Sequence, residues 1–161
     1  MHTHTLASLF VLLAALTLSG QPAVAAGGGG SDSALAVPED PDYAAGKRAV
    51  EAKNWQGALD AFNKVVAKDP RNADAHNYLG YTYRKSGQLD LAFKQYEEAL
   101  RLDPRHRGAH EYVGEAYLMT GNLAKAEEHL KALDSICFFG CEEYRELKKA
   151  VAEYKQKTAS K

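Results

Sequence analysis

The chain has 161 residues, which is enough for one ordinary domain, and 45% of them are hydrophobic. Its 20 lysines and arginines nearly balance 21 aspartates and glutamates. This composition is typical of a globular chain and excludes collagen-like and wholly disordered proteins. The near-neutral charge gives no support for binding to nucleic acid or to anionic membrane surfaces.

Residues 1–26 are predicted to be a signal peptide. They contain no Lys, Arg, Asp or Glu, and Leu6–Leu18 is an almost continuous apolar run. This run is shorter than the about 20 residues that cross a bilayer, and the small-x-small cleavage pattern Ala23–Ala25 follows it. We therefore expect cleavage after Ala25 or Ala26 and export to a bacterial periplasm, with secretion as the alternative. No membrane insertion is expected after cleavage.

Residues 27–38, GGGGSDSALAVP, are rich in Gly and Ser and are predicted to be a flexible linker. From Glu39 onward the sequence repeats with a period of about 34 residues, and Asp-Pro-Arg recurs at 69 and 103. Three units are predicted, at 39–72, 73–106 and 107–140. Four columns recur at this period: Gly46, Gly80 and Gly114; Ala58, Ala92 and Ala126; Phe62, Tyr96 and Leu130; Pro70, Pro104 and Phe138.

Each unit divides into two helices of about 12–14 residues, because apolar residues step by three and four along one face. Breaks at Asn54, Gly87 and Gly121 separate the two helices, and the Asp-Pro pairs end the second helix. The glycine column is expected to face the alanine column, so that the two backbones approach closely.

The second unit carries the clearest pattern: Leu79, Gly80, Tyr83, Ala92, Tyr96, Ala99 and Pro104. This pattern resembles the tetratricopeptide repeat family, and the resemblance covers about residues 39–140. It implies an all-α fold of three helix-turn-helix repeats in a right-handed α-solenoid, with a C-terminal capping helix. That helix is predicted at 141–157 and the tail at 158–161. Tyr144, Leu147, Val151 and Tyr154 would form its apolar face.

The only two cysteines, Cys137 and Cys141, bracket the turn before the capping helix. In an oxidising compartment a pair of thiols is more often joined than free. We predict a structural disulfide that stabilises the fold by about 2 kcal/mol, with Gly140 ending the preceding helix in a left-handed conformation. The Cys-x-x-x-Cys-Glu-x-Tyr motif also resembles a stretch of exported bacterial members of the family.

Catalytic and metal chemistry have weak support in the sequence. His106 and His110 are four residues apart, but His110 shares a column with His76, which favours a packing role and no metal site. The acidic pairs Glu97-Glu98 and Glu127-Glu128 point about 100° apart on a helix and are expected to be solvated. We therefore expect neither an enzyme nor a cofactor.

The family resemblance implies a concave groove, lined by the first helix of each unit, that receives a peptide or the surface of a protein. It would be lined by Tyr43, Lys47 and Val50, then Asn77, Tyr81, Arg84 and Lys85, then Glu111, Glu115, Leu118 and Met119. Tyrosines would anchor the partner, the basic residues would pair with its carboxylates, and the two glutamates would repel acidic segments. The alternative is that these are ordinary exposed helix residues. The family's basic clamp for a terminal carboxylate is not expected, because Tyr43 and Glu111 stand where it needs cations.

The sequence thus favours a non-catalytic adaptor that binds a peptide or protein partner in the groove. A self-associating structural protein is the second hypothesis, and light scattering would separate the two. A thiol or redox protein is the third, although three residues lie between Cys137 and Cys141 and no strand pattern surrounds them.

Overall fold

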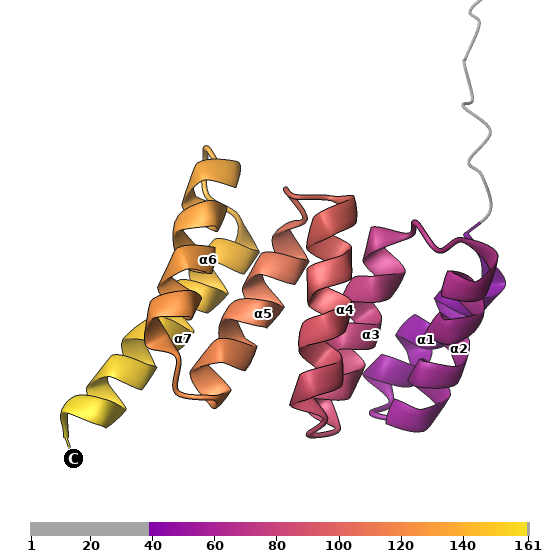
Figure 1. Cartoon of the computed structure of the whole chain (residues 1–161), viewed down its shortest axis with the longest axis horizontal. Coiled ribbons are helices and arrows are strands. Elements are labelled where there is room, and N and C mark those ends of the chain that lie inside the picture. Colours follow the sequence, from indigo (N-terminus) through magenta and orange to yellow (C-terminus); the bar gives the residue numbers. More distant parts are fainter. Residues whose placement is uncertain (1–38, 161) are drawn as a thin grey trace, which may run out of the picture. The chain divides into compact units, whose positions relative to one another are not determined.

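The computed structural model describes residues 39–160, so the predicted signal peptide, the predicted linker and Lys161 lie outside the described residues. Between 39 and 160 the chain forms seven helices and no strand, which confirms the all-α prediction (Figure 1). The helices are α1 (Pro41–Glu51), α2 (Trp55–Lys68), α3 (Ala73–Lys85), α4 (Leu89–Leu102), α5 (Arg107–Met119), α6 (Leu123–Ile136) and α7 (Glu142–Ala159). None of these helices has the length and apolar character needed to cross a membrane.

Local sequence signals set where the helices begin. The side chains of Asn54, Asn72 and Asn122 each accept a hydrogen bond from the backbone N–H three residues on, at 2.8–3.1 Å. These bonds satisfy N–H groups that a first helical turn leaves free. Asp69 and Asp103 are extended, as expected for a residue that precedes proline.

The turns inside the pairs share a left-handed residue. Gly87 and Gly121 have φ of 78° and 79°, and Lys53, at the matching position of the first pair, has φ of 55°. Glycine adopts this conformation without a steric penalty, whereas lysine does not. The same turn is therefore built three times, and the first copy is strained.

The glycine column allows close packing, but against different partners from those predicted. A Cβ at Gly46 would lie 2.6 Å from Cζ of Phe62, and one at Gly80 would lie 2.5 Å from Cε1 of Tyr96. The rings of the second helix thus cover the glycines, where the alanine column was expected. In the third pair the covering side chain is Leu147 of α7, whose Cδ2 would lie 2.6 Å from a Cβ at Gly114.

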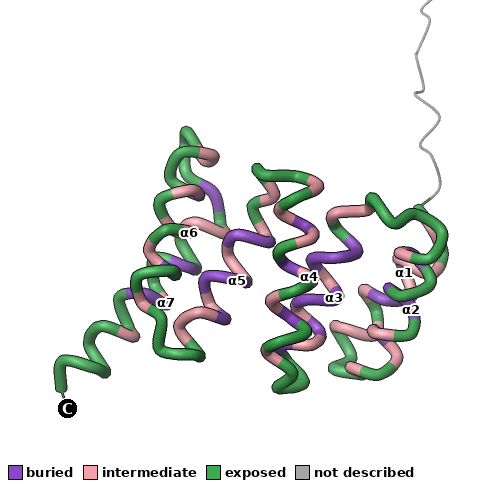
Figure 2. Tube along the Cα trace, viewed as in Figure 1, coloured by how far each residue is buried: buried purple, intermediate pink, exposed green. Residues whose placement is uncertain are grey.

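Helix α7 closes the apolar core at the end of the array. It packs on α5 and α6, and its Leu147 and Val151 are buried with Ala126 and Leu133 of α6. Figure 2 shows buried positions along the faces at which helices meet, with exposed positions outside. Helix α7 continues to Ala159, two residues beyond the predicted end.

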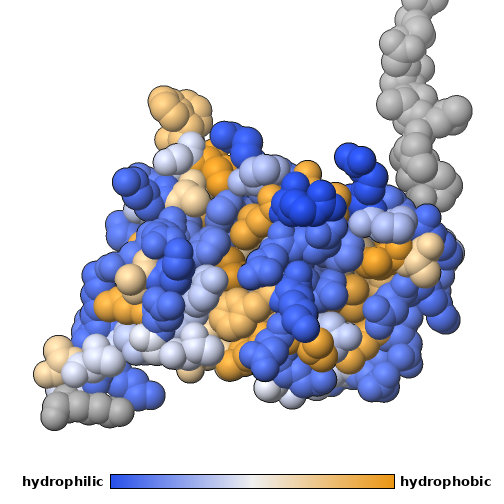
Figure 3. Space-filling model, viewed as in Figure 1, coloured by the Kyte–Doolittle hydropathy of each residue, from blue (hydrophilic) through white to orange (hydrophobic). Residues whose placement is uncertain are grey.

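The turn between α6 and α7 contains the cysteine pair. The sulfur atoms of Cys137 and Cys141 lie at disulfide distance, with the two Cα atoms 5.5 Å apart. Gly140 has φ of 81°, but α6 already ends at Ile136, so this glycine shapes the turn and does not end the helix as predicted. Phe138 and Phe139 between the cysteines are 87% and 96% exposed, and Figure 3 shows an apolar protrusion at this end of α6.

Candidate functional site

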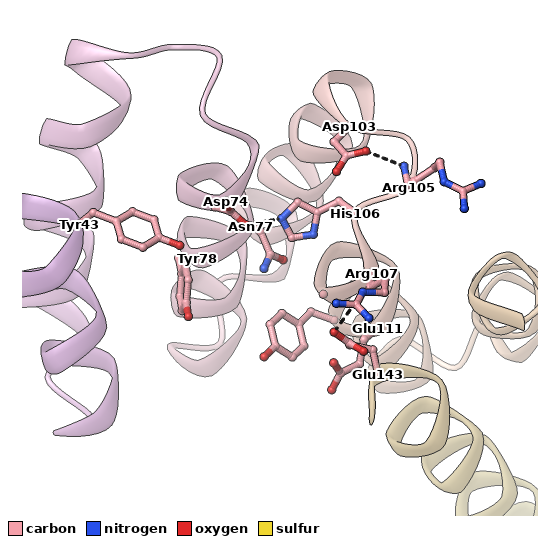
Figure 4. A pocket seen from close by; sticks show the side chains of 12 residues that line it. Tyr43, Asp74, Asn77, Tyr78, Asp103, Arg105, His106, Arg107, Glu111 and Glu143 are labelled. Carbon is pink, nitrogen blue, oxygen red and sulfur yellow. Dashed lines mark hydrogen bonds and ion pairs between the residues drawn. The ribbon is translucent and has the colours of Figure 1, made fainter. Parts of the chain in front are cut away.

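The first helices of the three pairs, together with the start of α7, line a cavity of about 390 Å³ (Figure 4). We call it the groove cavity. Its main contributors are Tyr43 of α1; Asp74, Asn77 and Tyr78 of α3; Arg107, Gly108, Glu111 and Tyr112 of α5; and Glu143 of α7. The turn before α5 adds three more, Asp103, Arg105 and His106. The cavity therefore brings together side chains that are far apart in the sequence.

Tyrosines form one side of the groove cavity. The ring of Tyr78 stacks on Phe62 at 4.8 Å and meets Tyr43 edge-on at 5.7 Å. The ring centroids of Tyr112 and Tyr81 lie 4.9 Å apart. Burial raises the pKa of the Tyr43, Tyr78 and Tyr112 hydroxyls, so they stay neutral and can donate or accept hydrogen bonds. Such rings give a partner apolar area with a polar edge.

Arg84 lies inside the array instead of facing a partner. Its side chain is 9% exposed, and its Nη2 lies 2.7 Å from Oε2 of Glu115. The guanidinium lies 5.4 Å and 5.5 Å from the ring centroids of Tyr81 and Tyr112. Predicted partner-binding residues Arg84 and Glu115 thus neutralise each other across α3 and α5, and neither offers a free charge to a partner.

The other two predicted cations differ from each other. Lys47 Nζ lies 2.7 Å from Glu39 Oε1 and 5.5 Å from the ring centroid of Tyr43. Lys85 is exposed at the end of α3, with Nζ 5.8 Å from the ring centroid of Tyr81. Neither Lys47 nor Lys85 lines the groove cavity.

Three further predicted positions lie outside the groove cavity. Val50 packs against the core between the first two pairs. Leu118 and Met119 line a different hollow, beside Tyr154 at the other end of α5. Of the residues carried over from the family, the groove cavity therefore brings together only Tyr43, Asn77 and Glu111.

Asn77 is the most deeply buried polar side chain of the groove cavity. It is 5% exposed, and its Oδ1 has no hydrogen-bond partner among residues 39–160. Leaving a buried acceptor unpaired costs about 1–3 kcal/mol. Figure 4 shows the amide of Asn77 between His106 and the tyrosine side of the cavity.

Glu111 is the central acid of the groove cavity. Burial, followed by the charges of Glu115, Glu143 and Glu146, raises its pKa to about 8. Within the described residues it forms no ion pair, whereas Glu143 lies 3.6 Å from Nε of Arg107. A second hollow, also lined by Glu111, adds the carboxylates of Glu142 and Glu146. This end of the groove is acidic.

The sequence prediction missed several cavity residues. His106 Nε2 lies 3.0 Å from Oδ1 of Asp74, and this contact holds the pKa of the Asp74 carboxyl below its usual value. Tyr78 and Tyr112 were also missed, although they occupy the same position in successive units. Two tyrosines in one column of the repeat were a signal that could have identified this aromatic side.

The histidines have packing roles. His76 lies 2.7 Å from Gln95 Oε1 and 3.1 Å from the carbonyl of Pro70. His110 makes the equivalent contact with Pro104 and has Nδ1 2.9 Å from Nδ1 of His129. His106 instead faces Asp74, so His106 and His110 point to different partners and do not converge on one point.

Comparisons with known proteins agree with this geometry. The family model described as Tetratricopeptide repeat matches residues 73–106, and the one described as TPR repeat matches residues 46–87. No curated protein matches the chain.

Solved structures share the fold. The type III secretion translocator chaperone SycD of Yersinia enterocolitica has a TM-score of 0.66 at 20% identity, over 73% of this chain and 83% of that one. SycD in complex with a peptide of the translocator YopD gives 0.63 at 21% identity, over 73% and 92%. The TPR2B domain of yeast Sti1, in complex with pHsp70, gives 0.66 at 20% identity, over 72% and 94%. The two family models identify tetratricopeptide repeats within residues 46–106, and the shared fold shows that the described residues have the tetratricopeptide repeat arrangement of helix pairs.

Proposed function

We propose that this protein is a non-catalytic adaptor that binds a segment of a partner protein in the groove cavity. The observation that carries the proposal is the groove cavity itself, in which three first helices and the start of α7 place tyrosine rings and an unpaired amide around one hollow. Polar groups that converge on one hollow can fix the orientation of a bound ligand, and the aromatic rings beside them supply apolar contact area.

Two of the structures that share the fold support this mode of binding. SycD is described in complex with a peptide of YopD, and the Sti1 domain in complex with pHsp70. Their identity to this chain is about one fifth, so they support a kind of ligand and no particular partner.

A groove-filling variant tests the proposal. Gly108 lines the groove cavity, and a Cβ there would lie 3.1 Å from Nδ2 of Asn77, so Gly108→Trp fills the hollow. Lys94→Trp on the exposed side of α4 is the matched control. Photo-crosslinking in the native cell, with a crosslinking residue at position 112, should give a partner adduct in the parent and in the control and none in Gly108→Trp. Equal adducts in all three would move binding away from the groove cavity.

We also propose that the adaptor acts after export, in a bacterial periplasm. The support is the uncharged apolar segment at Leu6–Leu18 and the cleavage pattern that ends at Ala25. The intact mass of the protein purified from osmotic-shock fluid should match a chain that begins at Ala26 or Gly27. A full-length mass, or recovery only with cytoplasmic proteins, would contradict export.

A further inference from the structure

The unpaired charges around the groove cavity are mainly negative. Asp74 is paired with His106, and Glu143 with Arg107. Glu111 and its neighbours in the second hollow, Glu142 and Glu146, have no ion-pair partner among residues 39–160. The exposed Arg105 is the cavity cation for which the described residues provide no carboxylate partner.

The buried side-chain oxygen of Asn77 is a second, independent indication that the groove cavity binds a ligand. Its Oδ1 is an acceptor with no donor among the described residues, and the side chain lines the same cavity as Glu111. An acceptor in this position is satisfied by an N–H group of a ligand, such as an ammonium or guanidinium group. An arriving carboxylate offers no donor and would leave the oxygen unpaired.

The aromatic side of the cavity suits the same ligand. The array already places cations against tyrosine rings, with Arg84 held between Tyr81 and Tyr112. Tyr112 and Tyr78 both line the groove cavity. A cation close to such a ring is attracted by the negative face of the ring, and more strongly where it is desolvated.

We propose that the groove cavity selects a cationic segment, in which a lysine or arginine side chain pairs with Glu111, lies against Tyr112 and donates a hydrogen bond to Asn77. This inference rests on the proposed function and adds the chemical class of the ligand. It also reverses the expectation from sequence that basic groove residues would pair with carboxylates of the partner. Those cations are either already paired, as Lys47 and Arg84 are, or lie outside the cavity.

A random peptide library displayed on phage provides the test, with the full chain as bait. Clones are kept only if they lose binding to Gly108→Trp and retain binding to Lys94→Trp. The kept peptides should be enriched in Lys or Arg. Replacing the enriched cation by Gln should weaken binding of the synthetic peptide about tenfold, as should Glu111→Gln. Glu97→Gln on the exposed side of α4 is the matched control and should leave affinity unchanged.

The pH dependence provides a second readout. Glu115, Glu143, Glu146 and Arg84 set the potential at Glu111, whose pKa is about 8 without ligand. A cation pairs with the ionised carboxylate, so affinity should rise between about pH 6 and about pH 9, while lysine and arginine stay charged. Glu111→Gln should remove this rise.

The outcomes distinguish a failure of the cationic-ligand inference from a failure of the proposed adaptor function. Kept peptides that are neutral or acidic, or full affinity in Glu111→Gln, would overturn the cationic ligand and leave the adaptor in place. A library with no clone sensitive to Gly108→Trp would overturn groove binding and, with it, this inference. Far-UV circular dichroism of each variant checks that helicity is unchanged.

Discussion

Lys53 occupies a backbone conformation that its side chain opposes. Its φ of 55° matches the 78° and 79° of Gly87 and Gly121 at the same position in later pairs. A residue other than glycine in the left-handed conformation costs about 1–2 kcal/mol. Glycine removes this steric cost, but it loses more backbone entropy on folding, which offsets part of the gain. Lys53→Gly should therefore stabilise the protein by about 1 kcal/mol in chemical denaturation. The reciprocal control, Gly87→Lys, should destabilise it by a similar amount, and a loss of stability in Lys53→Gly would contradict the strain.

Single residues also show which features of the groove could not be predicted from the sequence. The family resemblance implied Tyr43 and Asn77 as groove positions, but it could not show that Asn77 is buried with an Oδ1 that has no partner within the described part of the chain. Arg84 and Glu115 belong to different units, and their pairing depends on the offset between α3 and α5. The sequence pattern of a single helix gives no information about this offset between two helices. Charges read along a helix therefore overstate how many remain available to a partner.

Helices were predictable because each depends on local signals. Asparagine caps at 54 and 122, left-handed glycines at 87 and 121 and prolines at 70 and 104 each recur at the repeat period in two of the three units, so the pairing of helices followed from the sequence alone. The packing of the third pair was not predictable in this way, since Gly114 is covered by Leu147 from α7. The residues that cover the earlier glycines, Phe62 and Tyr96, correspond to Leu130 in the third pair, which has no ring, and α7 supplies Leu147 instead. An ion pair between Glu127 of α6 and Lys155 of α7 also joins α7 to this pair.

The cysteine pair in the turn between α6 and α7 is expected to stabilise the protein. A bridge between Cys137 and Cys141 closes a short loop and should stabilise the protein by about 2 kcal/mol, because it restricts the unfolded chain. Unfolding in urea should therefore shift to lower concentration when a reductant is added. The Cys137→Ala, Cys141→Ala variant should unfold at that lower concentration with or without reductant. Two thiols that alkylate freely before reduction would contradict the bridge and favour the redox hypothesis.

At the scale of the whole array, each helix pair mainly contacts its neighbours, so the free energy of unfolding is approximately a sum of local terms. Leu147→Ala should leave a cavity beside Gly114 and cost about 2–5 kcal/mol, all of it at the α7 end. The only tryptophan, Trp55, lies in α2 at the opposite end of the described array and contacts Tyr81 of α3.

The urea transitions that two spectroscopic probes follow should therefore separate in Leu147→Ala. Far-UV circular dichroism follows every helix, whereas Trp55 fluorescence follows the first pairs. In the parent protein the two urea transitions should nearly coincide. In Leu147→Ala the circular dichroism transition should begin at lower urea than the fluorescence transition, because α5, α6 and α7 lose their shared core first. If both transitions moved together, the coupling between pairs would exceed the local loss, and the groove cavity formed by α1, α3, α5 and α7 would assemble or unfold as one unit.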